Sequence, residues 1–377
     1  MKCNSRTTAV FLVLTLSQSF AAAQNEPARR SPESEAAAFQ KLESTLTFLR
    51  SRNARNYAIT TPNGIDEATY VKIGGIDHWI TIRGEDRTNP VLLFLHGGPG
   101  DAINPWGYAA FRSWLKYFTV VQWDQRGAGR TFGRNRGSSA SITPDRMIQD
   151  GIELSELLKK KLRKDKILLV GHSWGSVLGF FMVKARPDLF QAFVGTGQVA
   201  ADFSRSSAMA YAMVLERATR EGNKQAIQEL KEVGPPPFKD EKGFGTLHKW
   251  AMQFEGADVF LASALGFAFT APGYSVNDIN DWFDGQRISG EHLEPYFGEL
   301  DRKLIGGELG VPVIVIEGSD DYTTPPSLAK TYLDSLKAPH KAFVTIEGAG
   351  HFAVFTKQED FLRVLRAQLS SLNSPMQ

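Results

Sequence analysis

The chain has 377 residues, 42% of them hydrophobic and 22% charged, with a net charge of +2 from 43 basic and 41 acidic side chains. This composition is that of a globular protein, long enough for one large α/β domain with an insertion or for two domains. The near balance of charge gives no support for a nucleic-acid-binding surface.

Residues 1–23 have the features of a secretory signal peptide. Lys2 and Arg6 provide a positive start, residues 9–16 are apolar, and three alanines at 21–23 provide a cleavage site. The apolar stretch is too short to span a bilayer, so we expect no stable membrane insertion once the signal is removed. We predict an exported protein, periplasmic or extracellular. The only cysteine, Cys3, lies in this segment, so the mature chain has no disulfide.

Residues 24–60 predict a polar linker and one helix that packs on the domain. The helix has an apolar face at three- and four-residue spacing, made of Phe39, Leu42, Leu46 and Leu49. Two alternating segments follow, at 70–73 and 76–82, and the glycine pair between them predicts a β-hairpin.

Residues 61–199 predict the first part of an α/β core. Continuous apolar runs at 90–95 and 167–170 are typical of strands buried on both faces, and further strands are expected at 118–123 and 191–195. Helical segments, expected at 142–162 and 177–185, separate the strands. This alternation predicts a mostly parallel sheet with helices on both faces.

Residues 200–307 interrupt that pattern and predict an inserted helical cap. The segments 206–230 and 244–269 are helical in pattern, and a Gly-Pro-Pro-Pro break at 234–237 separates them.

The second part of the core, residues 308–377, resumes with strands at 311–316 and 341–346. A final amphipathic helix is expected at 358–372.

The segment at 171–175, Gly-His-Ser-Trp-Gly, lies between a strand and a helix and has the pattern of a nucleophile elbow. Such a turn projects the hydroxyl of Ser173 into a cleft and needs glycines on either side. The backbone N–H of Trp174, at the start of the helix, can donate to an oxyanion.

A serine nucleophile needs a base and an acid that orients it. Loops after parallel strands meet at one edge of a sheet, and two such loops carry Asp320-Asp321 and His351. The order Ser173, aspartate, His351 is that of a known catalytic triad. The acid is one of two neighbours, Asp320 or Asp321, and the resemblance described below favours Asp321.

The segment at 96–100, His-Gly-Gly-Pro-Gly, also follows a strand, and we predict that the N–H of Gly98 is the second oxyanion donor. No metal-ligand spacing is present, and the glycines at 127 and 129 lack the third glycine of a dinucleotide site. We therefore predict no metal and no cofactor.

Together these motifs resemble α/β hydrolases of the prolyl iminopeptidase type. The resemblance covers about residues 91–369 and includes Asp-Gln-Arg-Gly-Ala-Gly at 124–129 and the Gly-x-x-Asp-x-x-x-Pro loop at 318–325. It implies the α/β-hydrolase fold, with Ser173 as nucleophile, His351 as base and then acid, and Asp321 as the orienting acid. Asp124 and Arg126 are expected to stabilise their loop rather than react.

The resemblance also implies a substrate, the N-terminal proline of small peptides, whose amine such enzymes bind with cap glutamates. The stretch nearest to their Trp-x-x-Trp-Glu pattern ends in Glu255, one residue late and with Phe254 in place of the second tryptophan. Glu255 is thus the predicted substrate-binding residue, and no second glutamate can be assigned.

The sequence leaves two alternatives to an aminopeptidase. One is a carboxylesterase or small-amide hydrolase with the same triad, which the aromatic residues of the cap would suit. The other is a non-catalytic binding protein on a hydrolase fold. The oligomeric state is not predicted.

Overall fold

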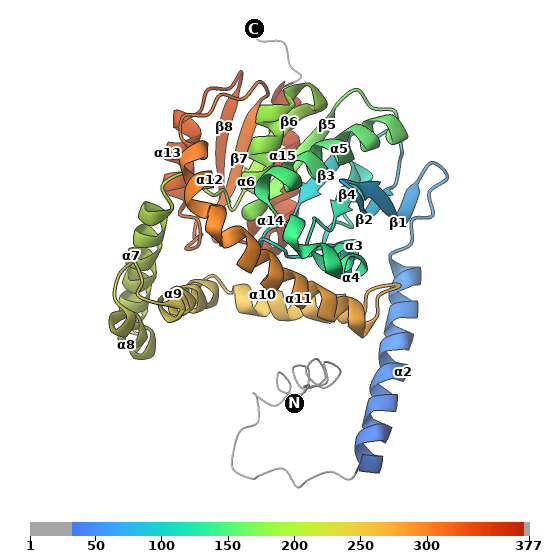
Figure 1. Ribbon diagram of the computed structural model, residues 1–377, viewed down its shortest axis with the longest axis horizontal. Coiled ribbons are helices and arrows are strands. Elements are labelled where there is room, and N and C mark those ends of the chain that lie inside the picture. Colours follow the sequence, from blue (N-terminus) through green and yellow to red (C-terminus); the bar gives the residue numbers. More distant parts are fainter. Residues whose placement is uncertain (1–31, 373–377) are drawn as a thin grey trace.

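The computed structural model describes residues 32–372. The predicted signal peptide lies outside the described residues. The first described element, helix α2 (Pro32–Asn56), projects from the body of the molecule in Figure 1. Only its C-terminal part is held: Arg50 Nε donates to the carbonyl of Phe269 (3.1 Å), and Asn53 Nδ2 donates to the carbonyl of Thr270 (3.1 Å). Phe39, predicted to pack, is 49% exposed because it lies on the projecting part.

Eight strands form one sheet in the order β1-β2-β4-β3-β5-β6-β7-β8. The strands are β1 (Ile65–Ile73), β2 (Ile76–Gly84), β3 (Val91–Leu95), β4 (Thr119–Trp123), β5 (Ile167–His172), β6 (Phe190–Thr196), β7 (Val313–Gly318) and β8 (Lys341–Ile346). The two hairpin strands are antiparallel to their neighbours and the other strands pair in parallel. The predicted mostly parallel sheet is confirmed.

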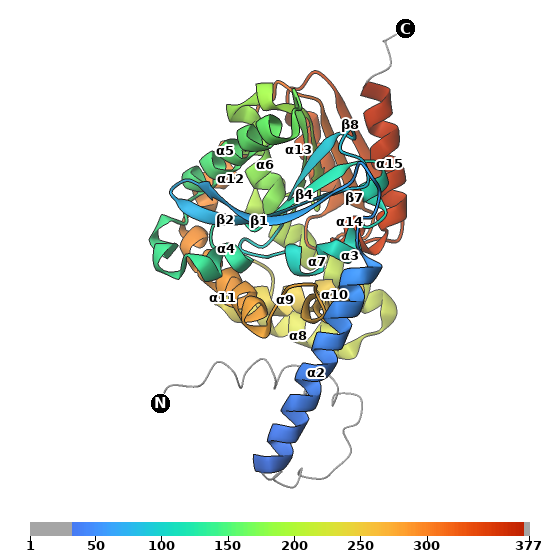
Figure 2. The same ribbon diagram turned by 90° about the vertical axis from the view of Figure 1, so that its right-hand side faces the viewer.

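Helices cover both faces of the sheet, as Figure 2 shows. Helices α5 (Pro144–Leu162) and α6 (Trp174–Ala185) lie on one face, and α15 (Gln358–Leu372) lies on the other. The strands contribute alternate residues to two separate cores. Leu93 packs in the core that includes α5 and α6, whereas Leu92 packs in the core that includes Phe361 of α15. This two-sided burial explains why the central strands are continuous apolar runs.

Between β6 and β7 the chain is helical and lies beyond the sheet edge that bears the elbow (Figure 1). The helices are α7 (Phe203–Glu221), α8 (Lys224–Val233), α9 (Glu241–Phe254), α10 (Ala257–Phe269), α11 (Val276–Leu293) and α12 (Phe297–Leu304). Each of the two helical segments predicted in this region is in fact two helices. The breaks fall at Gly222 and Gly256, whose φ angles of 67° and 66° end one helix and reorient the next.

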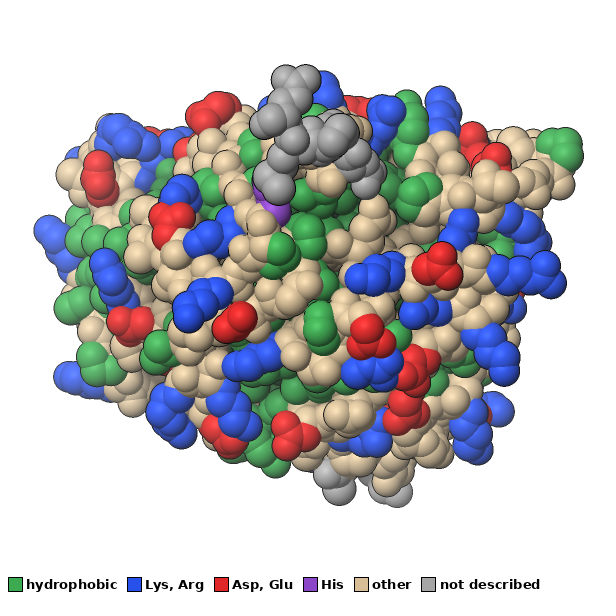
Figure 3. All heavy atoms as spheres, turned by 90° about the horizontal axis from the view of Figure 1, so that it is seen from above, with side chains coloured by type: hydrophobic (Ala, Val, Ile, Leu, Met, Phe, Trp, Pro, Cys, Tyr) green, Lys and Arg blue, Asp and Glu red, His purple; other side chains and the backbone are tan. Residues whose placement is uncertain are grey.

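Three further helices each follow a strand of the sheet: α3 (Asn104–Ala110) after β3, α4 (Gly129–Arg134) after β4, and α13 (Pro326–Ser335) after β7. On the face seen in Figure 3, basic and acidic side chains are interspersed. Among the described helices, none has both the length and the apolar character needed to cross a membrane.

Candidate active site

Ser173 occupies the sharp turn between β5 and α6. Its backbone has φ 53° and ψ −121°, a strained conformation for a residue with a side chain. A Cβ on Gly171 would lie 2.3 Å from the carbonyl oxygen of Gly175, and a Cβ on Gly175 would lie 2.2 Å from that of Leu95. The two glycines are therefore required by close backbone contacts, and the elbow presses against the end of β3.

Asp321 lies in the loop between β7 and α13 and is fully buried. Its Oδ1 accepts hydrogen bonds from the backbone N–H groups of Thr323 (2.9 Å) and Thr324 (2.6 Å). Its Oδ2 accepts from the hydroxyl of Thr324 (2.7 Å) and lies 2.9 Å from Nδ1 of His351. Asp320, the alternative acid, donates its backbone N–H to the carbonyl of Ala349 and is not the partner of the imidazole.

His351 lies in the loop after β8 and is buried. Because Asp321 is an acceptor, Nδ1 carries the proton and Nε2 is left free to accept one. Burial alone would lower the pKa of His351. The charge of Asp321, the hydrogen bond with it and the charge of Glu255 outweigh burial, so the pKa is raised above its ordinary value.

Ser173 and His351 adjoin the same turn at the end of β6. The N–H of Ser173 donates to the carbonyl of Thr196 (3.0 Å), and a Cβ on the next residue, Gly197, would lie 2.7 Å from Cε1 of His351. The structure shows no hydrogen bond between the described side chains of Ser173 and His351. Catalytic hydrogen bonds of this kind commonly shorten only when substrate is bound.

Gly98 and Trp174, the predicted oxyanion donors, line one cavity together with Ser173. Trp174 is the first residue of α6, so its N–H has no acceptor within its own helix. Gly98 has φ 110°, and a Cβ there would lie 2.7 Å from the N atoms of both Gly100 and Asp101. Only glycine fits this position.

The cavity has a volume of about 210 Å³ and lies between the core and the cap. The core contributes Trp174 and Val177, and the cap contributes Phe203 of α7 with Phe297 and Leu300 of α12. The described lining residues include no Asp, Glu, Lys, Arg or His. The arrangement therefore offers a neutral, largely apolar site beside the hydroxyl of Ser173.

The lining does not include Glu255, for which the sequence predicts substrate binding. Its carboxylate instead meets the two loops of the triad. Oε1 accepts the backbone N–H of Tyr322 (2.7 Å) and Oε2 accepts that of His351 (2.8 Å). Burial and the charge of Asp321 raise the pKa of Glu255 to about 7.

Gln125 links the elbow to the loop after β3. Its Oε1 accepts from the indole Nε1 of Trp174 (3.2 Å), and its Nε2 donates to the carbonyl of His96 (3.0 Å). The neighbouring Asp124 is fully buried and accepts from Asn104 Nδ2 (2.7 Å) and from the N–H of Arg130 (2.9 Å). Burial raises the pKa of Asp124 to about 7. These contacts are structural, as expected for Asp124.

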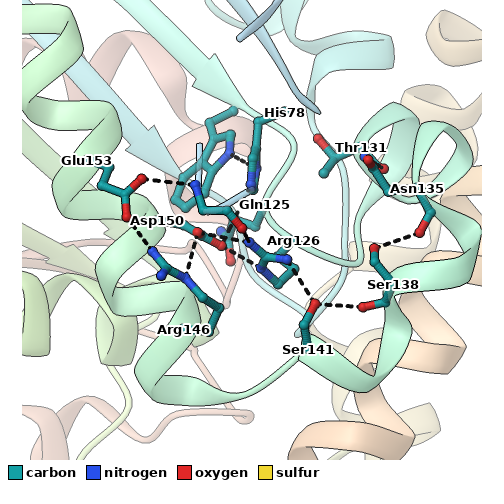
Figure 4. Close-up of polar contacts among 12 residues, drawn as sticks. His78, Gln125, Arg126, Thr131, Asn135, Ser138, Ser141, Arg146, Asp150 and Glu153 are labelled. Atoms are coloured by element: carbon teal, nitrogen blue, oxygen red, sulfur yellow. Dashed lines mark hydrogen bonds and ion pairs between the residues drawn. The ribbon is translucent and has the colours of Figure 1, made fainter. Parts of the chain in front are cut away.

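Arg126 is buried within the polar cluster drawn in Figure 4. Its guanidinium pairs with the fully buried Asp150 of α5 through two contacts, Nε to Oδ2 (2.6 Å) and Nη2 to Oδ1 (3.0 Å). It also donates to the hydroxyl of Ser141 (2.8 Å) and to the carbonyl of Gly74 (3.0 Å). Arg126 therefore joins the loop after β4 to α5 and to the β-hairpin, and none of these contacts reaches the cavity.

Two residues support the triad without having been predicted to do so. Nε2 of His172 donates to the carbonyl of His351 (3.1 Å), and burial with the nearby charge of His351 lowers the pKa of His172 to about 3, so its imidazole is neutral. The hydroxyl of Thr324 lies 3.1 Å from Nδ1 of His351 and also donates to Asp321. The sequence carries no signal for the role of Thr324, because threonine is common in such turns.

Within the described part of the chain, no group of three or more His, Cys, Asp or Glu side chains is placed to hold a metal ion.

The sequence profile of the alpha/beta hydrolase family matches residues 92–364. A probable aminopeptidase YbaC of Bacillus subtilis (strain 168) is 30% identical over 74% of this chain and 89% of its own length. A proline iminopeptidase of Lactobacillus helveticus (strain DPC 4571) is 23% identical over 78% of this chain and 95% of its own length.

Among solved structures, a proline iminopeptidase-related protein of Thermus thermophilus aligns with a TM-score of 0.53. It is 20% identical and covers 82% of this chain and 98% of its own. That likeness concerns the fold alone. The fold agrees with the family profile, which is that of the alpha/beta hydrolases. The chain belongs to the alpha/beta hydrolase family, and its relatives include proteins named aminopeptidase and proline iminopeptidase.

Proposed function

We propose that the protein is a serine hydrolase that acts through an acyl-enzyme. The proposal rests on one observation. Asp321 is hydrogen-bonded to His351, and His351 lies beside the strained turn that bears Ser173. A histidine with its Nδ1 proton fixed by a buried carboxylate is suited to take a proton from a serine hydroxyl.

In the proposed reaction, Oγ of Ser173 attacks the substrate carbonyl while Nε2 of His351 takes the hydroxyl proton. The N–H groups of Gly98 and Trp174 donate to the oxyanion that forms. His351 then gives its proton to the leaving group, which departs and leaves an acyl-enzyme. Water, activated by the same imidazole, hydrolyses the ester and regenerates Ser173.

The first candidate substrate is the N-terminal residue of small peptides, with proline preferred. The support is the names of the relatives, one of them 30% identical over 74% of the chain. An enzyme of this kind recognises a free amine, which is cationic at neutral pH and is best bound by a carboxylate.

The second candidate is a carboxylic ester or a small neutral amide. The neutral lining of the cavity favours it, because an unpaired ammonium group buried there would be costly. A non-catalytic binding protein is the third possibility. A missing triad residue would support it, but all three residues of the proposed triad are present.

We also propose that the protein is exported to the periplasm or the medium, as the N-terminal 23 residues predict. Expression of the full chain in a bacterium, followed by mass determination of the secreted form, tests this. A mature N-terminus at Gln24 is the expected result, and an intact cytosolic chain would contradict it.

Labelling with a fluorophosphonate tests the proposed mechanism without knowledge of the substrate. Wild-type protein should be labelled on Ser173, and Ser173→Ala should not be labelled. Ser173→Ala or His351→Ala should also lower turnover by about 10⁴-fold or more. Near-normal turnover in either variant would contradict the triad, and an unlabelled wild type would favour the binding protein.

Parallel assays then separate the two substrate classes. Turnover of a proline arylamide well above that of Ser173→Ala would support the aminopeptidase. Turnover of a short-chain nitrophenyl ester alone would mean that the cap serves another acyl group.

A further inference from the structure

Glu255 connects the cap to both loops of the proposed triad. It directly follows α9, and its two carboxylate oxygens accept different backbone N–H groups, from Tyr322 at 2.7 Å and from His351 at 2.8 Å. One donor is the residue after Asp321 and the other is the proposed base itself. They lie 67 and 96 residues away in sequence, so the contacts depend on the tertiary structure.

The loop after β8 is shaped to receive this carboxylate. A Cβ added to Gly350 would lie 2.6 Å from Cβ, Cγ and Oε2 of Glu255. Any side chain at Gly350 would displace Glu255, so the glycine before His351 is explained by the close approach of the carboxylate. This observation is independent of the hydrogen bonds.

The same geometry argues against a direct role in binding substrate. Glu255 does not line the cavity beside Ser173, and each of its oxygens already accepts a short, charge-assisted hydrogen bond from the backbone.

We propose that Glu255 is a positioning residue, whose carboxylate fixes the loop of Asp321 relative to the loop of His351 and so holds the imidazole in place for Ser173. The inference rests on the proposed serine mechanism. It also makes the geometry of the triad depend on the position of the cap relative to the core, because Glu255 belongs to the cap whereas both loops belong to the core.

Glu255→Gln is the sharpest test, because it changes the hydrogen bonding with little change in size. A glutamine has one oxygen to accept one backbone N–H, and its NH₂ group then faces the other donor. The rate constant of fluorophosphonate labelling should fall by about 10- to 100-fold, the size expected when a catalytic group is misplaced by up to about 1 Å.

Glu229→Gln is the matched control. Glu229 is also a cap glutamate, on α8, and it accepts from Lys249 (2.8 Å) and from the indole of Trp250 (2.9 Å) on α9, away from the triad. Labelling of this variant should stay within about twofold of wild type, since surface changes away from special features have small effects. Thermal unfolding of both variants confirms that the labelled proteins are folded.

Gly350→Ala is a second, independent variant that displaces the carboxylate without removing it, and it should also slow labelling. If wild type is labelled on Ser173 while both Glu255→Gln and Gly350→Ala react at the wild-type rate, the positioning role is overturned and the serine mechanism stands. If wild type is not labelled, both proposals fail.

Steady-state kinetics separate positioning from amine binding. On whichever substrate pair is turned over, one with a free α-amine and one with that amine acetylated, Glu255→Gln should lower kcat to the same degree and leave KM nearly unchanged. A rise in KM confined to the free amine, with normal kcat on the acetylated substrate, would instead make Glu255 an amine-binding residue and overturn the inference.

Discussion

At the scale of single residues, two carboxylates set the protonation of His351. Burial favours the neutral imidazole, but Asp321 and Glu255 favour the charged form more strongly, so the pKa of His351 is raised. A base must be neutral to accept a proton, so activity should be absent below this pKa and should rise as the pH increases through it. We predict that the acid limb of the labelling rate lies above pH 6.5, the ordinary value for histidine (about 6.5).

The charge of Glu255 contributes to that limb because it helps to raise the pKa of His351, while burial and the charge of Asp321 raise the pKa of Glu255 itself to about 7. The apparent values therefore belong to the pair. Glu255→Gln removes an anion that favours the imidazolium, so the limb should move to lower pH, while Glu229→Gln should leave it unchanged. A limb of wild type at or below about pH 6.5, or no movement in Glu255→Gln, would contradict this electrostatic account.

How far the sequence predicts the site differs from residue to residue. Ser173 and His351 could be proposed as catalytic residues because each follows a strand in a glycine-rich turn, and such turns meet at one edge of a parallel sheet. The structure brings Asp321, rather than Asp320, against His351. The contacts of Glu255 could not be predicted, since nothing local in the sequence indicates which backbone donors a cap carboxylate meets.

At the scale of elements, Arg126 and Asp150 join the loop after β4 to α5 (Figure 4). Both side chains are almost fully buried, so removing Arg126 takes a buried charge partner from Asp150 and leaves that carboxylate with the partly exposed Arg146. We predict that Arg126→Met lowers the free energy of unfolding by about 3 kcal/mol or more. Urea denaturation followed by circular dichroism measures this.

Arg287→Met is the control for that prediction, because Arg287 pairs with Glu291 on the exposed face of α11. Exposed pairs of this kind contribute little, and the variant should unfold within about 0.5 kcal/mol of wild type. Equal stabilities of the two variants would contradict the prediction. They would mean that Arg146, which also contacts Asp150 at 2.9 Å, compensates for the loss of Arg126.

The elements themselves were predictable where burial imposes a simple period. The central strands are buried on both faces and α15 runs from Gln358 to Leu372, as its apolar spacing predicts. The cap was harder, because helical periodicity continues across the breaks at Gly222 and Gly256. In both places a glycine with positive φ turns the chain without a proline to mark the boundary.

At the scale of the whole molecule, the cavity is built jointly by core and cap, so its chemistry could not be predicted from either alone. The chain carries many charged side chains of both signs, yet none of them is among the described residues that line the cavity. In the proposed mechanism, the motifs of the core specify the reaction, and the cap residues that line the cavity select the acyl group. Substrate choice therefore belongs to a part of the chain that carries no motif.

This neutral lining gives a direct prediction for substrate preference. Ser206, on α7, lines the cavity and is only partly exposed, so Ser206→Asp would place a carboxylate there. A carboxylate near a bound ammonium group stabilises it by about 1 kcal/mol in a well-solvated site, so the ratio of kcat/KM for a free-amine substrate over its acetylated form should rise several-fold. Ser204→Asp, on the same helix but exposed and outside the lining, should leave the ratio unchanged. An equal rise in both variants would indicate long-range attraction by net charge, and no rise in Ser206→Asp would show that the substrate amine is held away from α7.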